Sequence, residues 1–300
     1  MSETRRLRSP GARGNRLMAF HDILLALVSY PDATPGPAID RAVRVARRLG
    51  GEVTALGVQI RVEAPKNMLA EALLGLESLA AGERAKSAAS LREALDRFSN
   101  DARAVGLTAF QEIQASHLYD EAHVVVGHAR TRDMTIVPVG PAPASSQPIA
   151  EHLLFDSGRP VVVTPETGPL DAETGPYRTV AIAWDGSRPA ARAVGDALPL
   201  LKQARDVRVL SVINEKPSVT AGCGHDLVRH LAAHGITATV DEVDDAGRDI
   251  AEAFQAYAAD KGVEFLVMGG FARSRVREVI LGGATAGVLA KPFIPTLMAH

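Results

Sequence analysis

Residues 266–295 read LVMGGFARSRVREVILGGATAGVLAKPFIP, and this stretch carries the clearest indication of the fold. It combines a short apolar run, the pair Gly269-Gly270, a basic segment, and then Gly282-Gly283 at the start of a second, Ala-rich run. This pattern predicts a strand, a loop and a helix, as in an α/β protein. Glycines let backbone amides approach an anion, and a helix N-terminus adds partial positive charge, so the stretch also predicts an anion site.

The spacing of these glycines excludes two common nucleotide-binding loops. Neither GxxxxGK[ST] nor GxGxxG occurs in the chain, so the sequence indicates neither a P-loop NTPase nor a Rossmann dinucleotide site. The glycines are equally consistent with a plain turn and helix entry that bind nothing. Spacing alone leaves both interpretations open.

The same alternation of strands and helices runs along the chain. Short β-branched runs predict strands at residues 23–28, 53–60, 109–113, 134–139 and 160–164, and again at 179–184, 207–213, 238–243, 265–268 and 295–299. Longer Ala-rich segments predict helices at residues 37–49, 67–104, 119–130 and 147–155, and again at 189–202, 221–234, 247–261 and 285–291. Both halves have the order β-α-β-α-β-α-β-α-β, so we expect two tandem α/β domains, each with an open five-stranded parallel sheet.

Composition narrows the functional classes. The chain has 300 residues, of which 46% are hydrophobic and 4% aromatic, so the core must come mainly from Ala, Val, Leu and Ile. With 33 Lys and Arg against 35 Asp and Glu, the formal charge of -2 disfavours nucleic acid or a membrane surface as partner. No run reaches the roughly 18 consecutive apolar residues of a membrane span. The single Cys223 excludes an internal disulfide, and we expect a soluble, cytoplasmic protein.

Two polar segments divide the chain. Residues 1–17 hold five Arg and little to bury, so we expect a disordered leader that ends before Met18, a candidate start. An Arg-rich leader also resembles a transit peptide, an alternative that its helix-breaking Gly and Pro weaken. Residues 166–177, rich in Pro, Gly, Thr and acidic residues, predict a linker between domains at 18–165 and 178–300.

Each predicted domain closes with a run led by proline, at residues 160–164 and 295–299. Because proline lacks an amide donor, such strands are plausible sheet edges, and exposed edges need covering. We expect the two strands to pair antiparallel within one chain, as an internal pseudo-dimer. Further assembly into a homo-oligomer and the identity of a protein partner stay open.

Two segments of the second half resemble the universal stress protein family. The spacing Gly269-x2-Ala272-x9-Gly282-Gly283 is similar to the family signature G-x2-G-x9-G-(S/T), and VAIAWDGSRPAARAV at residues 180–194 is similar to its first strand and helix. The resemblance implies a tandem universal stress protein with an adenine-nucleotide alpha hydrolase-like fold, strand order 3-2-1-4-5, and a role in stress response. It further implies ATP, alone or with Mg²⁺, at the carboxyl ends of the first and fourth strands, where open α/β sheets generally bind ligands.

Carried over by position, the resemblance assigns roles to residues of the second half. Asp185, with Ala183 beside it, would contact the adenosine portion, and Val212 would line the adenine pocket. Met268 and Gly269 would flank the ribose.

The resemblance places the phosphates of the nucleotide against residues 272–285, which follow Gly269. Backbone amides would come from Gly282, Gly283 and Ala284. Arg273 stands where many family members have a basic residue. The sequence departs from the family signature at two positions. Ala272 replaces the second glycine, and Gly283 replaces the Ser or Thr whose hydroxyl would bond a phosphate oxygen. Thr285, two residues later, is the residue that would supply a hydroxyl instead. Losing one neutral hydrogen bond costs about 0.5 to 1.5 kcal/mol, so we expect weak binding.

The first half departs further from the family pattern. Val28 stands where the family has an Asp at the end of its first strand, and residues 140–148 read GPAPASSQP. The prolines of this loop remove amide donors from the place where a phosphate needs them. We therefore expect a degenerate domain with a structural role; an anion held by Ser145 and Ser146 is the alternative.

Other residues that carry chemistry have ordinary explanations. Cys223, His225, His230 and His234 lie close in sequence, but no carboxylate stands at metalloprotease spacing, so we expect no metal site. Ser187 lacks the GxSxG context of a nucleophile and predicts a helix cap instead.

These observations favour a nucleotide-binding stress-response sensor or adaptor that uses its second domain. A structural or interaction module that binds no nucleotide is the alternative, because Ala272 and Gly283 both weaken the motif. No general base, metal cluster or nucleophile with an orienting partner is visible, so the sequence supports at most a slow ATPase.

Overall fold

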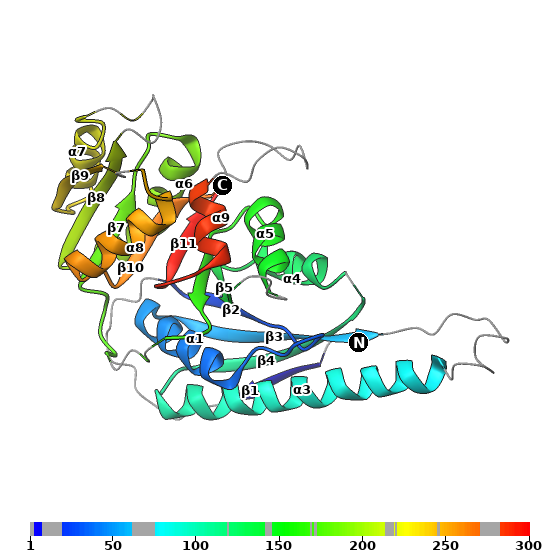
Figure 1. The fold of residues 1–300 in the computed structure, drawn as a ribbon. Helices are drawn as coiled ribbons and strands as arrows, with labels where there is room; N and C mark the ends of the chain where they lie inside the picture. Colours follow the sequence, from blue (N-terminus) through cyan, green and yellow to red (C-terminus); the bar gives the residue numbers. More distant parts are fainter. Residues whose placement is uncertain are drawn as a thin grey trace.

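The strands of the protein form one mixed sheet (Figure 1). The computed structural model describes residues 3–7, 20–61, 76–118, 120–141, 146–168, 170, 173–213, 219, 221–244, 247–270 and 283–300. Within them eleven strands have the order β1-β4-β3-β2-β5-β6-β11-β10-β7-β8-β9. Their bounds are β1 Glu3–Leu7, β2 Asp22–Leu27, β3 Glu52–Arg61, β4 Ala109–His117, β5 Met134–Val139, β6 Val161–Pro165, β7 Thr179–Ala183, β8 Asp206–Ile213, β9 Ala238–Asp244, β10 Phe265–Gly269 and β11 Thr296–Ala299.

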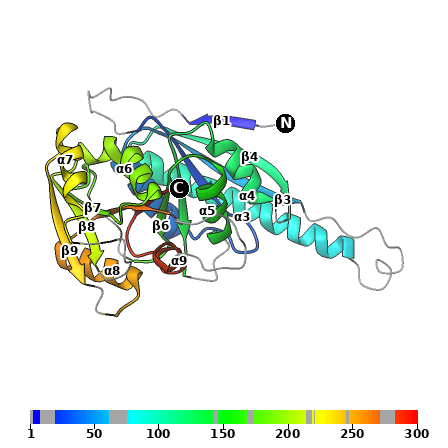
Figure 2. The same cartoon turned by 90° about the horizontal axis from the view of Figure 1, so that it is seen from above.

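Helices cover both faces of the sheet. Their bounds are α1 Gly36–Leu49, α3 Leu76–Ala104, α4 Glu121–Ala129, α5 Gln147–Asp156, α6 Arg188–Leu201, α7 His225–Ala233, α8 Ile250–Lys261 and α9 Gly283–Ala290. Because side chains alternate along a strand, Ile23 and Leu25 of β2 belong to the buried cluster that includes α1, α3, α6 and α7. Leu24 and Ala26 belong to the opposite cluster, with α4, α5, α8 and α9. The long helix α3 extends well past the sheet, as Figure 2 shows.

Each half has the predicted strand order. The runs β4-β3-β2-β5-β6 and β9-β8-β7-β10-β11 both read 3-2-1-4-5 in order of appearance. This confirms the prediction of two tandem, five-stranded α/β units.

Some element ends differ from the prediction. The strand expected at residues 109–113 continues to His117, because β4 pairs with β3 as far as Arg61. The helix expected from residue 221 begins only at His225, because Gly222 has a φ of 85° and turns the chain first. The start expected at residue 67 for the long helix lies outside the described residues.

The leader is the clearest difference from the sequence prediction. Glu3–Leu7 form β1, which pairs antiparallel with residues 109–113 of β4 at the outer edge of the sheet. The expectation of disorder over residues 1–17 is therefore wrong at this strand. It rested on side chains with little to bury, whereas a strand ladder uses backbone groups that any residue except proline supplies.

The two halves join through their closing strands. β6 and β11 run antiparallel, with Leu297 opposite Val162 and Met298 opposite Val161. Both strands are buried along their whole length. The pairing predicted for residues 160–164 and 295–299 is confirmed, and it covers two edges that would otherwise be open.

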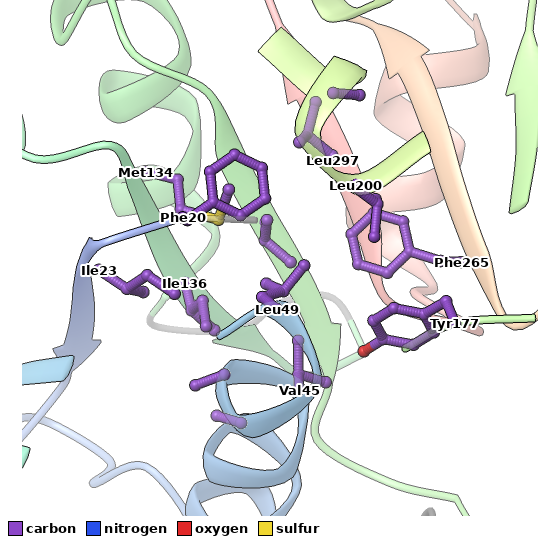
Figure 3. Packing of buried hydrophobic residues seen from close by; sticks show 14 of the residues in the cluster. Phe20, Ile23, Val45, Leu49, Met134, Ile136, Tyr177, Leu200, Phe265 and Leu297 are labelled. Atoms are coloured by element: carbon purple, nitrogen blue, oxygen red, sulfur yellow. The ribbon is translucent and has the colours of Figure 1, made fainter. Parts of the chain in front are cut away.

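The core continues across this junction. Phe20, Ile23 and Met134 of the first half belong to the same buried cluster as Leu200 and Phe265 of the second (Figure 3). The two halves therefore share apolar contacts besides the strand ladder.

The predicted linker takes part in this core, contrary to its polar composition. Tyr177 is only 1% exposed, and its ring centroid lies 4.8 Å from that of Phe265. The guanidinium carbon of Arg48, from α1, lies 3.7 Å from the centre of the Tyr177 ring. Arg48 Nη2 also donates to Glu264 Oε2 at 2.5 Å. Tyr177, together with Arg48, anchors the end of the segment at residues 166–177 between the halves.

Candidate functional site

The carboxyl ends of β7 and β10 lie side by side, where the strand order reverses direction. Ala183 of β7 pairs with Met268 of β10 on one side and with Leu210 of β8 on the other. Val212 lies two residues beyond Leu210 on β8. Ala183, Met268 and Val212 are all buried. The structure therefore brings these three predicted site residues to one edge of the sheet, on three adjacent strands.

Asp185 begins the turn from β7 into α6. Its Oδ1 accepts a hydrogen bond from the amide of Ser187 at 3.0 Å, across Gly186, whose φ of 70° favours glycine. Ser187 Oγ accepts from the amide of Ala190 at 3.3 Å, which confirms the predicted cap of α6. This turn holds the half-buried Asp185 two residues after the end of β7.

Gly269 has a packing role that its spacing did not reveal. A Cβ built on this residue would lie 2.5 Å from the nitrogen of Ala190 and 2.8 Å from the carbonyl carbon of Pro189. Any side chain would push the first turn of α6 away from β10, so the fold requires glycine at this position. The packing interpretation therefore explains Gly269 without a ligand. The same contact brings the amino end of α6 to the carboxyl end of β10.

The first turn of α9 is the described part of the expected phosphate side. α9 begins at Gly283, which is exposed, whereas Ala284 is half-buried and Thr285 is buried. The helix packs closely on α8, because a Cβ at Gly287 would lie 2.7 Å from Ala251 Cβ. Burial of Thr285 gives a phosphate less access to its hydroxyl than the sequence alone implies.

Three of the predicted site residues lie outside the described residues, namely Ala272, Arg273 and Gly282. The described part of the candidate site consists of Ala183, Asp185, Val212, Met268, Gly269, Gly283, Ala284 and Thr285.

The sheet register identifies the counterparts of these residues in the first half. The pair Ile23 and Met134 of β2 and β5 corresponds to Val180 and Phe265 of β7 and β10. Counting forward, Val28 corresponds to Asp185 and Pro138 corresponds to Gly269. Proline removes an amide donor and fills the space that glycine leaves open. The first half therefore lacks both the carboxylate and the glycine of the candidate site.

The alternative anion site of the first half is described in part. Ser146 precedes α5, and its Oγ is buried without a hydrogen-bond partner within the described ranges. Ser145 lies outside the described residues. A buried hydroxyl leaves an anion little access, so this position gives the alternative no support.

The cysteine and histidines of the second half are not gathered into a site. His225 Nδ1 lies 3.0 Å from the carbonyl of Gly222, and the rings of His230 and His234 pack edge to face at 4.8 Å. In the part of the chain that the structure describes, no group of three or more His, Cys, Asp or Glu side chains is placed to hold a metal ion.

Sequence reasoning missed the part that Trp184 plays beside Asp185. The indole Nε1 of Trp184 donates to the carbonyl of Cys223 at 3.1 Å, and its own carbonyl accepts from Ser211 Oγ at 3.1 Å. Cys223 Sγ in turn donates to Ser211 Oγ at 3.3 Å. These bonds fix the backbone immediately before Asp185. The single tryptophan of the chain, at a predicted strand end, is the signal that the sequence offered.

A second polar network ties β8, β9 and α8 together. Tyr257 Oη donates to Asp241 Oδ2 at 2.5 Å, and Arg208 Nη1 donates to the same oxygen at 2.9 Å. Burial, reinforced by the bond to Asp241, raises the pKa of the Tyr257 phenol. The phenol therefore stays neutral at ordinary pH, and the network holds structure rather than supplying a base.

The fold and the site define a doubly wound α/β protein with its candidate ligand edge at a topological switch point. Residues 176–300 match the model of the universal stress protein family. The match covers the second half of the chain, and the first half repeats the same strand order without matching the family model.

Two solved structures resemble the chain over nearly its whole length. A universal stress protein from Archaeoglobus fulgidus DSM 4304 is 16% identical with a TM-score of 0.64, over 94% of this chain and 97% of that one. A functionally unknown protein from Pseudomonas aeruginosa PAO1 is 16% identical with a TM-score of 0.51, over 95% of this chain and 94% of that one. At such identities the likeness shows the fold alone.

No curated protein sequence matches the chain. Across the described residues, no helix has both the length and the apolar character needed to cross a membrane.

Proposed function

We propose that the second half binds an adenine nucleotide, with ATP as the first candidate, and that the chain acts as a stress-response sensor or adaptor. The observation that carries the proposal is the placement of Asp185. Asp185 lies at the switch point, two residues after the buried Ala183 of β7, which pairs with the buried Met268 of β10. This half is also the one that matches the family.

The surroundings of the site fit a nucleotide. The amino end of α6 packs against Gly269, so its partial positive charge lies at the same edge of the sheet. α9 offers an exposed Gly283 in its first turn, where backbone amides are not used within the helix. Mg²⁺, where it binds, would enter with the phosphates of the nucleotide.

Calorimetry with ATP, ADP and AMP, with and without Mg²⁺, tests the proposal. We expect micromolar or weaker binding that Asp185→Asn reduces by about 10- to 100-fold, as for a hydrogen bond to a charged group. The Asn variant keeps the Oδ1 that accepts from Ser187, so the turn is preserved. Asp260→Asn, on the last turn of α8, is the control and should bind normally. Absence of heat up to millimolar nucleotide would contradict the proposal.

Stoichiometry tests the assignment of the site to one half. Because the first half has Val28 and Pro138 at the counterpart positions, saturation should occur at one nucleotide per chain. A fitted value near two would show that the first half binds as well.

An interaction module that binds no nucleotide is the second candidate. Gly269 favours it, because packing against Ala190 requires this glycine whether or not a ligand binds. Mass spectrometry of small molecules released from the purified protein separates the candidates: a co-purified adenine nucleotide supports binding, and its absence together with silent calorimetry supports the module.

A further inference from the structure

Gly270 is the residue at which the described chain leaves β10. Its amide donates to the carbonyl of Ala299 at 2.8 Å. Its carbonyl accepts from Nδ1 of His300 at 3.0 Å. Residues at the end of β11 therefore hold both backbone groups of Gly270.

Side chains from α5, in the first half, reach the same residue. A Cβ built on Gly270 would lie 2.4 Å from Leu154 Cδ2 and 2.9 Å from Leu154 Cδ1, so Leu154 occupies the space of the missing side chain. The adjacent Phe155 ring packs edge-on against the His300 ring, with centroids 5.1 Å apart. α5 thus touches Gly270 directly through Leu154 and indirectly through His300.

Neither the backbone conformation nor the architecture of a single half requires glycine at position 270. Gly270 is not among the glycines with a left-handed φ, so backbone conformation does not explain it. In the first half the sheet register makes Val139 its counterpart, and that valine is completely buried. The same point of the fold therefore accepts a branched side chain. Glycine at position 270 serves the close approach of Leu154.

We propose that Leu154, Phe155 and His300 are positioning residues for the nucleotide site, and that they act through Gly270. They fix the point at which the chain leaves β10, directly after Met268 and Gly269. The half without the candidate site residues would thereby set the nucleotide affinity of the other half. This inference rests on the proposed function.

A double-mutant cycle tests the direct contact. Gly270→Ala should weaken ATP binding about tenfold or more, because the new methyl and Leu154 cannot occupy the same space. Leu154→Ala in the same chain should restore affinity to within about threefold of wild type, because truncation makes room for the methyl. Gly195→Ala is the matched control, since a Cβ at this glycine in α6 meets nothing within 4 Å, and its affinity should be unchanged.

A second pair of variants tests the contact through His300. His300→Asn keeps a donor at the position of Nδ1 and should bind ATP nearly normally, whereas His300→Ala should bind more weakly. This pair also decides the matter if Gly270→Ala does not fold.

The outcomes separate the two proposals. If the wild-type chain binds no ATP, ADP or AMP, the proposed function fails. If it binds and Gly270→Ala binds equally well, the positioning role is wrong. A melting temperature lowered by Gly270→Ala at unchanged affinity, or a double variant that stays weak, would also overturn the positioning role.

Discussion

The two halves share a strand order but finish their first strands differently. In the second half Asp185 follows β7 and its carboxylate stays half-buried at the switch point. In the first half the amide of Val28 donates to Thr34 Oγ1 at 3.0 Å, and Ser29 Oγ donates to the carbonyl of Val58 at 2.6 Å. At the position that corresponds to Asp185, the polar groups of the first half are thus bonded within that half.

The second strand of each five-stranded unit, β3 in the first half and β8 in the second, shows a similar difference. A Cβ on Gly57 of β3 would lie 2.1 Å from Leu91 Cδ1, so α3 packs directly onto this strand. By register the counterpart of Gly57 is Ser211 of β8, whose hydroxyl instead holds the backbone of Trp184. Strand order places the carboxyl ends, and the residues there decide whether they form a site or part of the core.

The largest effect is expected where the halves join. Val162→Pro should reduce the free energy of unfolding by about 3 kcal/mol or more, through a lost ladder bond, an unpaired carbonyl and a ring clash. β6 has a strand on each side, so the amide of Val162 faces a partner strand in either direction. Urea unfolding measures the loss. Val162→Ala, which keeps the amide, should cost about 2 kcal/mol, and equal losses would show that the ladder does not join the halves.

A smaller effect is expected at the contact between α1 and the second half. Arg48→Ala should cost about 2 kcal/mol, below the roughly 3 to 5 kcal/mol for breaking a fully buried ion pair, because Glu264 keeps 27% side-chain exposure. The control is Arg178→Ala, whose pair with Glu173 is more than half exposed on both sides and should contribute less than about 1 kcal/mol. Similar losses for the two variants would mean that Arg48 does not connect the halves energetically.

The smallest effect concerns an acid at the start of the predicted linker. Burial raises the pKa of Glu166, the residue that follows β6, above its ordinary value of 4.5. The folded chain therefore binds this proton more tightly than the unfolded chain, so its stability declines as pH rises from about 4.5 through the folded pKa. Glu166→Gln should remove this part of the decline when thermal melts are compared across that range. If the slope of the Glu166→Gln variant equals that of the wild type, burial of Glu166 has no part in the decline.

Local patterns in the sequence predicted the alternation of strands and helices and the two tandem α/β units, whereas the strand order 3-2-1-4-5 came from the resemblance to the family. Hydrophobic periodicity and the placement of Gly and Pro mark each strand and helix, because both depend on residues only a few positions apart. The same local evidence predicted the cap by Ser187. It also predicted the pairing of the closing strands, since each begins after a proline at a domain end. The resemblance to the family, rather than a local pattern, placed Asp185 and the apolar residues near it at the carboxyl ends of adjacent strands.

Tertiary structure alone decided the features that depend on distant residues. Register across the sheet makes Pro138 the counterpart of Gly269. The comparison of the loop at residues 140–148 with the family signature did not show this correspondence. Tyr177 is buried because Arg48 and Phe265 contact it from different halves, although the segment before it is rich in Gly, Pro and polar residues. Gly270 is glycine because of Leu154, more than a hundred positions earlier. A contact of this kind is set by packing between separate elements, and no local pattern records which distant side chain will occupy a given space.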